Sequence, residues 1–334
     1  MSKFGTSSFY SSSMNKLGYK SIDLIVNDEI LQNKWAHEHK LKIHKSKILS
    51  RIMNLPYFNR VFGSPVWVQK IALAQIQEIK PDIVYIHNLS ILNPSTLKKI
   101  KKLCRLLVGQ IACPLPPIKN IKPFDLIITS FPHFVSLFKK MGIDSEYQKL
   151  AFEPEMLKIT DKCSKKYDVT FIGSFTPYHQ EGIKILEEVA KNIPIHVWGQ
   201  GLEFLSPFSP IRKNYHGEAW GIEMYKIFRQ SKIVLNRHIS TSKDYANNMR
   251  LYEATGMGAL VITDHKRNLN NLFKVGKEIV EYKSSKNLIN RIKYYLKHDE
   301  ERKKISKAGQ KRTLKEHNYY VRSKRLIKIL NKYL

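Results

Sequence analysis

The sequence predicts an α/β protein made of two Rossmann-like domains, each built around a parallel sheet. Its 334 residues exceed the roughly 250 to 300 that one hydrophobic core serves. Short β-branched runs alternate with helical patterns, which is typical of parallel sheets covered by helices. The alternation pauses in a polar stretch at residues 151–166 and then starts again, so this stretch is expected to link the two domains.

The first half, residues 1–155, is expected to form the N-terminal domain. It opens with the helical pattern FYSSSMNKLG at residues 9–18, and proline opens later helical runs such as PSTLKKIKKL, as suits a first turn. Buried strands are expected at residues 21–27, 82–87, 105–111 and 124–130, and helices at 29–41, 65–79, 94–103 and 132–142.

The second half repeats the pattern over residues 165–312, and a separate basic helix is expected at 313–334. Strands are expected at residues 167–173, 193–199, 232–236, 259–263 and 278–282, and helices at 178–191, 220–230, 249–257 and 285–317. The second domain is therefore expected to be Rossmann-like as well.

Composition narrows the class of protein. An apolar content of 43% is enough for globular cores. Three cysteines without a C-x-x-C or zinc spacing argue against a disulfide framework and favour a reducing cytoplasm. No leader-like apolar segment and no membrane-spanning run is seen, so we expect a soluble protein or one bound at a membrane surface.

The charge is strongly positive, because 57 basic and 28 acidic residues leave a net charge of +29. Such a balance favours a polyanionic partner, namely nucleic acid, an anionic membrane face or a phosphorylated ligand. The basic residues are dense at positions 300–316 and 321–330. The alternative is that a lysine-rich background composition accounts for most of the excess.

The segment NNMRLYEATGMGALVITD, residues 247–264, predicts a short helix followed by a buried strand. An asparagine caps the start, and Gly256 or Gly258 suits the end. Arg250 and Glu253 are three positions apart and share a face, so they could simply form an ion pair worth about 0.2 to 0.5 kcal/mol. In an open parallel sheet, however, ligands bind at the carboxyl ends of the strands, where this helix begins.

Other polar groups are expected at the same edge. Arg237 and His238 follow the strand at 232–236, and Gly173 and Ser174 end the first strand of the domain. Cations, backbone N–H groups and a single carboxylate suit a diphosphate and a ribose diol. Taken singly, Gly173 could be a turn residue and His238 a structural one.

The C-terminal half resembles the GT-B glycosyltransferases, in particular the CgeB or spore-maturation-like group with a "glycosyl transferases group 1" domain. The similar stretches are YDVTFIGS, IHVWGQG, SKIVLNRH and NNMRLYEATGMGALVITD, within roughly residues 165–320. The phrases LGYKSIDLIVNDEILQNKWAHEH and KPDIVYIHNLS are similar to the first domain of that group. The resemblance implies two parallel sheets that face each other across a cleft.

The resemblance also implies a nucleotide-sugar donor on the C-terminal domain and a glycan, lipid-linked or protein acceptor on the N-terminal domain. It assigns the ribose to Glu253, the diphosphate to Arg250 and Arg237, and the base to loops that include Gly199, Gly201, Gly217 and Glu218. No metal or other cofactor is implied, because basic side chains and helix dipoles can stabilise the leaving diphosphate. No D-x-D motif is present.

Two departures limit the resemblance. Tyr245 stands where retaining relatives carry a second glutamate, so the stereochemistry is left open. The usual first strand and glycine-rich loop are absent from the start of the sequence, which is expected to alter the acceptor side. His87, after the strand at 82–87, is the catalytic candidate, as a base or as a group that orients the sugar, although a structural role is an equal alternative.

The sequence leaves two alternative functions open. A GT-B-fold nucleotide-sugar epimerase would bind the same donor but would need an internal acid and base instead of an acceptor site. A non-catalytic polyanion-binding protein would explain the charge. Specific nucleic-acid binding is not expected, because the sequence carries no RNA-recognition signature, helix-turn-helix or zinc-finger spacing.

Overall fold

The computed structural model describes residues 3, 5–43, 64–160 and 163–334. The chain divides into two compact units. We call Lys20–Gln148 with Leu326–Leu334 the first-sheet unit, and Met1–Tyr19 with Lys149–Arg325 the second-sheet unit. Within the described ranges, none of the helices combines the length and the apolar character that a membrane span requires.

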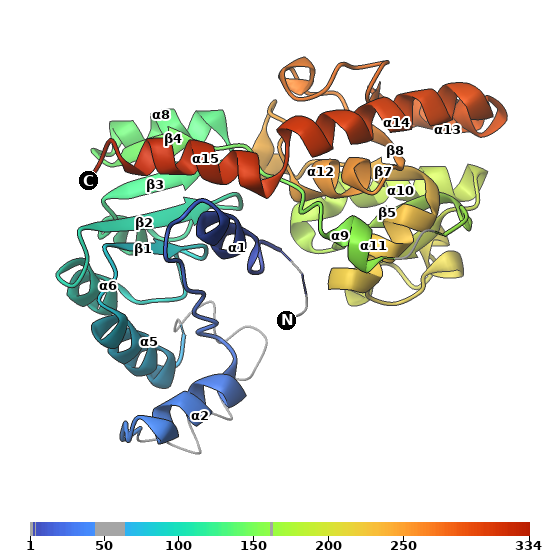
Figure 1. Cartoon of the computed structure of the whole chain (residues 1–334). Helices are drawn as coiled ribbons and strands as arrows, with labels where there is room; N and C mark the ends of the chain where they lie inside the picture. Colours follow the sequence, from blue (N-terminus) through green and yellow to red (C-terminus); the bar gives the residue numbers. More distant parts are fainter. Residues whose placement is uncertain (1–2, 4, 44–63, 161–162) are drawn as a thin grey trace. The chain divides into compact units, whose positions relative to one another are not determined.

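The first-sheet unit holds a four-stranded parallel sheet in the order β1-β2-β3-β4 (Figure 1). Buried aliphatic and aromatic side chains of the strands and helices form its core. The elements are α2 Glu29–Glu38, α5 Val66–Ile79, β1 Ile83–Ile86, α6 Pro94–Lys101, β2 Leu106–Ile111, α7 Ile118–Ile121, β3 Leu126–Thr129, α8 Pro132–Lys140 and β4 Asp144–Tyr147.

The prediction of a strand at residues 21–27 is wrong. Residues 21–25 have no regular structure, and a turn follows at 26–27. Leu24 and Val26 do pack against the core, but as partly buried side chains of an irregular segment. The side-chain amide of Gln32 donates to the Ile25 carbonyl over 3.1 Å, which satisfies an acceptor that a strand would have used for pairing. Conversely, β4 was not expected, because its sequence DSEY is polar.

The second-sheet unit holds a five-stranded parallel sheet in the order β6-β5-β7-β8-β9. The strands expected in this half of the sequence are all present. The elements are α1 Phe9–Lys16, α9 Met156–Ile159, β5 Tyr167–Ile172, η1 Pro177–His179, α10 Gln180–Asn192, β6 His196–Trp198, α11 Gly221–Gln230, β7 Ser231–Asn236, α12 Met249–Gly256, β8 Leu260–Asp264, β9 Val280–Tyr282, α13 Ser285–Lys297 and α14 Asp299–Glu316.

The strand order of this sheet reverses between β5 and β7. The chain leaves β5 through α10 toward β6, then returns through α11 to β7 on the other side of β5. Because such crossovers are right-handed, α10 and α11 cover opposite faces. α13 packs beside α10, and α12 packs with both α11 and α14. A sheet of this kind binds ligands at the point of reversal, beyond the carboxyl ends of β5 and β7.

The unit boundaries differ from the expected domains at both ends. The rings of Phe9 and Tyr10 pack on Tyr319, at centroid distances of 5.0 and 5.1 Å, so α1 belongs to the second-sheet unit. Near the C-terminus, Tyr333 and Lys332 contact Glu146 of β4. Consequently α15, Tyr319–Leu330, runs from one unit into the other.

The single helix expected at residues 285–317 is interrupted. α13 ends at Lys297, and α14 begins at Asp299. His298 between them adopts φ −107° and ψ 73°, outside the helical region. Asp299, Glu300 and Glu301 then occupy the first turn of α14, where their charges are favourable to a new helix start.

A buried histidine at the end of α14 makes stability depend on pH. The Nε2 atom of His317 lies 2.7 Å from the Leu272 carbonyl, and its Nδ1 lies 2.7 Å from the Arg322 guanidinium. Because Arg322 can only donate, Nδ1 accepts and Nε2 carries the proton. Burial lowers the pKa of His317 to about 3, and the nearby cations Arg322, Lys149 and Arg312 also lower it.

Acidification is therefore expected to destabilise the second-sheet unit through His317. Above pH 6.5 the imidazole is neutral both folded and unfolded, so its contribution is fully present. Between pH 6.5 and about 3 only the unfolded state takes up the proton, and each pH unit costs up to about 1.4 kcal/mol. Urea unfolding of wild type and His317→Gln across this window would measure the effect. Equal slopes in both proteins would contradict it.

Candidate functional site

The start of α12 is fixed to the carboxyl edge of the sheet by Asn248. Its side-chain oxygen accepts from the backbone N–H of Leu251 and so caps the helix. Its side-chain nitrogen donates to the Asn236 oxygen over 2.8 Å and to the Arg237 carbonyl over 3.2 Å. The helix start and the end of β7 therefore meet, as the sequence predicted.

Arg250 and Glu253 form the ion pair that was the simpler of the two sequence interpretations. The Arg250 Nη1 atom lies 2.6 Å from the Glu253 carboxylate, and Nε donates to the Ile172 carbonyl at the end of β5. Only 2% of the Glu253 side chain is exposed. Burial raises the pKa of Glu253, while Arg250 and the Tyr225 hydroxyl oppose that rise. The pair is thus part of the domain interior as well as of the predicted site.

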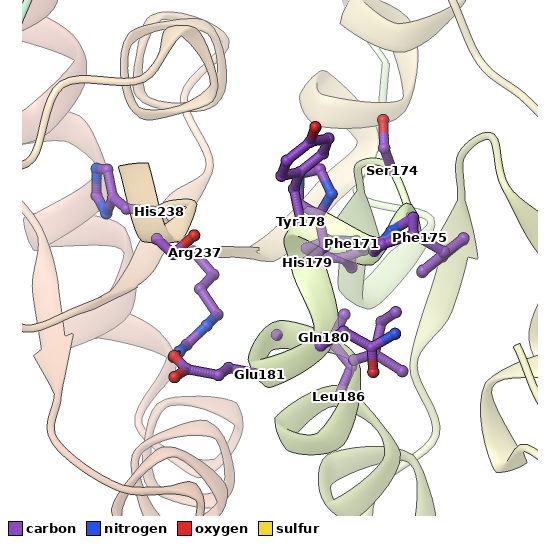
Figure 2. Close-up of a pocket in the computed structure, with 14 residues that line it drawn as sticks. Phe171, Ser174, Phe175, Tyr178, His179, Gln180, Glu181, Leu186, Arg237 and His238 are labelled. Carbon is purple, nitrogen blue, oxygen red and sulfur yellow. The ribbon is translucent and has the colours of Figure 1, made fainter. Parts of the chain in front are cut away.

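A cavity of about 260 Å³ opens at the point where the strand order reverses (Figure 2). Ser174 after β5 and Arg237 and His238 after β7 line it, so three of the predicted donor-binding residues come together. Residues of the first turn of α10 line it as well, and backbone N–H groups at a helix start attract anions. Aromatic walls complete it, from Phe171, Phe175, Tyr178 and His179.

Arg237 lies across the first turn of α10. Its Nη2 atom is 2.7 Å from the carboxylate of Glu181, and Figure 2 shows the side chain extended toward that residue. A Cβ atom added at Gly182 would come within 3.1 Å of the Arg237 Cδ atom, so the side chain rests close to the helix backbone. In this arrangement the guanidinium of Arg237 is paired with the Glu181 carboxylate, which an anionic ligand would have to displace.

His238 is held by Asp264, the last residue of β8. The Nδ1 atom lies 2.7 Å from the Asp264 carboxylate, which also accepts from the His238 backbone N–H. Burial opposes ionisation of Asp264, but the hydrogen bonds and charge of His238 outweigh it, with a contribution from Lys266, and lower the pKa of this carboxyl. Asp264 therefore fixes the orientation of the His238 ring at the carboxyl edge.

The two loops predicted to enclose the base lie next to each other. The Gly199 N–H donates to the Gly217 carbonyl over 2.9 Å, and the Tyr215 hydroxyl donates to the Gly199 carbonyl. A Cβ atom at Gly199, where φ is +153°, would stand 1.6 Å from the Gly173 carbonyl. Gly199 must therefore be glycine, because the chain segments after β5 and β6 come close together there.

The remaining residues of this region are also placed. The Ser174 hydroxyl accepts from the Gln200 side chain over 3.3 Å, and Gly201 takes a left-handed φ of +93°. The carboxylate of Glu218 accepts from the indole of Trp220 over 2.7 Å. Of the predicted residues, Ser174, Arg237 and His238 line the cavity, whereas Gly173, Arg250, Glu253 and the four residues of the base loops stand outside its lining.

His87 belongs to the first-sheet unit, directly after β1. Its ring lies edge-on to Tyr85, with centroids 5.0 Å apart. Desolvation lowers the pKa of His87 to about 4, and the hydrogen bond that the imidazole donates to the Gln110 side chain opposes this shift. The imidazole is then neutral at pH 7, as a proton acceptor must be.

Two residues that pair with the predicted side chains were missed by the sequence prediction. Asp264 ends a strand at the carboxyl edge, so the rule that selected Arg237 and His238 would also have selected it. Glu181 gave no signal, because its pairing with Arg237 joins residues 56 positions apart in sequence.

Comparisons with known proteins give a domain match and a fold. Residues 180–328 match a domain family described as "Glycosyl transferase-like". No curated protein matches the sequence. Several solved structures resemble the chain in three dimensions at low sequence identity.

A glycosyltransferase from Rickettsia africae is 13% identical, with a TM-score of 0.62, and the match covers 97% of this chain and 93% of that one. HepE of Anabaena, solved with UDP and glucose, is 11% identical, with a TM-score of 0.60 and coverage of 79% and 82%. Sucrose-phosphate synthase of Thermosynechococcus elongatus is 10% identical, with a TM-score of 0.59 and coverage of 80% and 77%. These likenesses confirm the GT-B fold, and the domain match supports a glycosyltransferase.

Proposed function

We propose that the protein transfers a sugar from a nucleotide-sugar donor to an acceptor, and that the second-sheet unit holds the donor. The observation that carries this proposal is the cavity between the ends of β5 and β7. It combines Arg237, the Ser174 hydroxyl and the first turn of α10, which suit the two phosphates of a nucleoside diphosphate. UDP is the nucleotide we favour, because HepE was solved with UDP-glucose.

Several finer points belong to the same proposal. We place the protein in the CgeB-like group and the acceptor among cell-surface glycans, lipid-linked glycans and proteins. His87 is proposed as the base or orienting residue. The ribose is proposed to pair with Glu253 after its contact with Arg250 opens, and the base to lie against the loops at Gly199, Gly201, Gly217 and Glu218.

We propose further that transfer needs no metal ion. Arg237 and Arg250 would stabilise the charge that develops on the leaving diphosphate, which is the role a divalent ion has in other transferases. The location we propose is the cytoplasm, at the inner face of the membrane. Neither the epimerase nor the polyanion-binding alternative is favoured by the domain match.

Thermal unfolding with nucleotides tests the proposal. UDP and UDP-sugars at about 100 times their dissociation constants should add roughly 2.7 kcal/mol of stability. Uridine, which lacks the diphosphate, should add little, because the cations and helix start of the cavity then have no partner. Transfer or donor hydrolysis should continue in excess EDTA. If no nucleoside diphosphate raised the melting temperature, the donor site would be refuted.

A further inference from the structure

α13 and α14 each present one face that contains several exposed lysines. On α14, Lys304, Lys307, Lys311 and Lys315 are three, four and four positions apart, which places them on a single face. All four are exposed, and we call them the α14 lysine row. At 1.5 Å per residue the row extends over about 16 Å.

The opposite face of α14 is fixed to the second-sheet unit. Ile305 is buried in the core, and a Cβ atom at Gly309 would stand 2.2 Å from the Glu278 carbonyl. The Thr313 hydroxyl contacts that of Thr255 over 2.7 Å, and Gln310 donates to the Gly256 carbonyl. The lysine row is therefore held in place by a rigid helix.

α13 repeats this arrangement. Lys286, Lys293 and Lys297 are exposed and share one face, and we call them the α13 lysine row. Leu288 and Ile292 on the other side of the helix are buried in the core. Because α13 packs beside α10 and α14 packs with α12, the two rows lie on opposite sides of the sheet, and only one of them can face a flat surface at a time.

The acidic residues of these helices do not neutralise either row. Asp299 pairs with Arg302 and Lys303, and Glu300 also pairs with Lys303. Glu316 pairs with Arg312, and Glu301 accepts from the Tyr294 hydroxyl. Among the described residues, none of the lysines of the two rows has an ion pair. Their charges are therefore available to an external anion.

We infer that the α14 lysine row docks the protein on an anionic phospholipid surface. Lysine is a compact, strongly hydrated charge that does not require the bidentate geometry favoured by arginine. α14 contains no aromatic residue for stacking on nucleobases, so a lipid surface fits better than nucleic acid. The inference rests on the proposed location at a membrane face, but not on sugar transfer.

Sedimentation with vesicles tests the inference on the full chain. Wild type should bind vesicles of equal parts phosphatidylcholine and phosphatidylserine and ignore phosphatidylcholine alone. Each lysine near an anionic surface strengthens binding about fivefold, so replacing the α14 row by glutamine should weaken it about a hundredfold or more. Binding should also vanish in 1 M salt, where the Debye length falls to about 3 Å.

A matched control variant shows whether vesicle binding depends on this surface or only on the net charge of the protein. Lys98→Gln, Lys99→Gln, Lys102→Gln and Lys139→Gln together remove the same charge from exposed positions of the first-sheet unit. This control should bind vesicles like wild type. Equal loss in both quadruple variants, equal binding to neutral vesicles, or binding to duplex DNA but not to vesicles would overturn the inference.

Folding and donor binding are followed separately. The α14 variant should keep the UDP-induced thermal shift of wild type, because the row lies outside the cavity. If that variant failed to fold, Lys307→Gln with Lys311→Gln would replace it in the assay, with a loss of vesicle binding of about twentyfold. Vesicle binding without any nucleotide shift would leave the docking surface intact and refute the donor site alone.

Discussion

Replacing Arg250 by alanine is expected to destabilise the protein by about 3 kcal/mol. The change removes the cation that lies 2.6 Å from a carboxylate with 2% of its side chain exposed, and breaking a buried ion pair in this way is strongly unfavourable. It also removes the donor to the Ile172 carbonyl and the contact of the guanidinium with the Phe228 ring. Urea unfolding of the wild type and the variant measures the loss. A difference below about 0.5 kcal/mol, the value of a surface pair, would contradict it.

A double variant separates the contribution of this ion pair to stability from its proposed role in nucleotide binding. Arg250→Met with Glu253→Leu leaves no buried charge, and such replacements are often neutral or stabilising. The introduced methionine side chain would face Met224 and Phe228, which contact the wild-type arginine. We expect the double variant to fold and to bind UDP at least about tenfold more weakly, because the carboxylate proposed for the ribose is gone. If calorimetry showed an unchanged affinity for UDP, the pair would have only a structural role.

The sequence was most informative about the strands that are buried on both faces and about the residues that directly follow them. β-branched runs such as KIVLN and ALVIT became central strands, because only a covered parallel sheet buries both faces of such a run. The ends of those strands then identified Arg237 and His238. The segment SIDLIVN shows the limit of this reasoning, since Leu24 and Val26 bury part of their surface without joining a ladder.

The contacts inside the site depended on tertiary structure. No local pattern indicates that Glu181 forms an ion pair with Arg237. Nor does the sequence show that the Gly173 carbonyl leaves no room for a side chain at Gly199. The spacing of Arg250 and Glu253 suggested a pair but not its burial, which changes its expected contribution from a few tenths of a kcal/mol to several. Sequence patterns thus located the edge of the sheet, and the packing determined which side chains meet there.

Arg237→Ala is expected to lower the rate of sugar transfer about a hundredfold to a thousandfold while leaving the fold intact. In the proposed reaction, negative charge grows on the leaving diphosphate, and losing one donor placed against such charge has an effect of this size. Stability should change by less than about 1 kcal/mol, because 82% of the side chain of its partner Glu181 is exposed. Single-turnover rates with saturating UDP-sugar, measured beside urea unfolding, give both quantities.

Two further variants make this result specific to the cavity. Arg291→Ala removes an equal charge from the exposed surface of α13 and should keep the wild-type rate. Glu181→Gln should tighten UDP binding by up to about fivefold, because the diphosphate no longer competes with a carboxylate whose pairing is worth at most about 1 kcal/mol. The assignment of Arg237 to the diphosphate fails if Arg237→Ala keeps its rate, or if Glu181→Gln binds UDP more weakly. In the second case, Glu181 would be holding Arg237 in position for the ligand instead of competing with it.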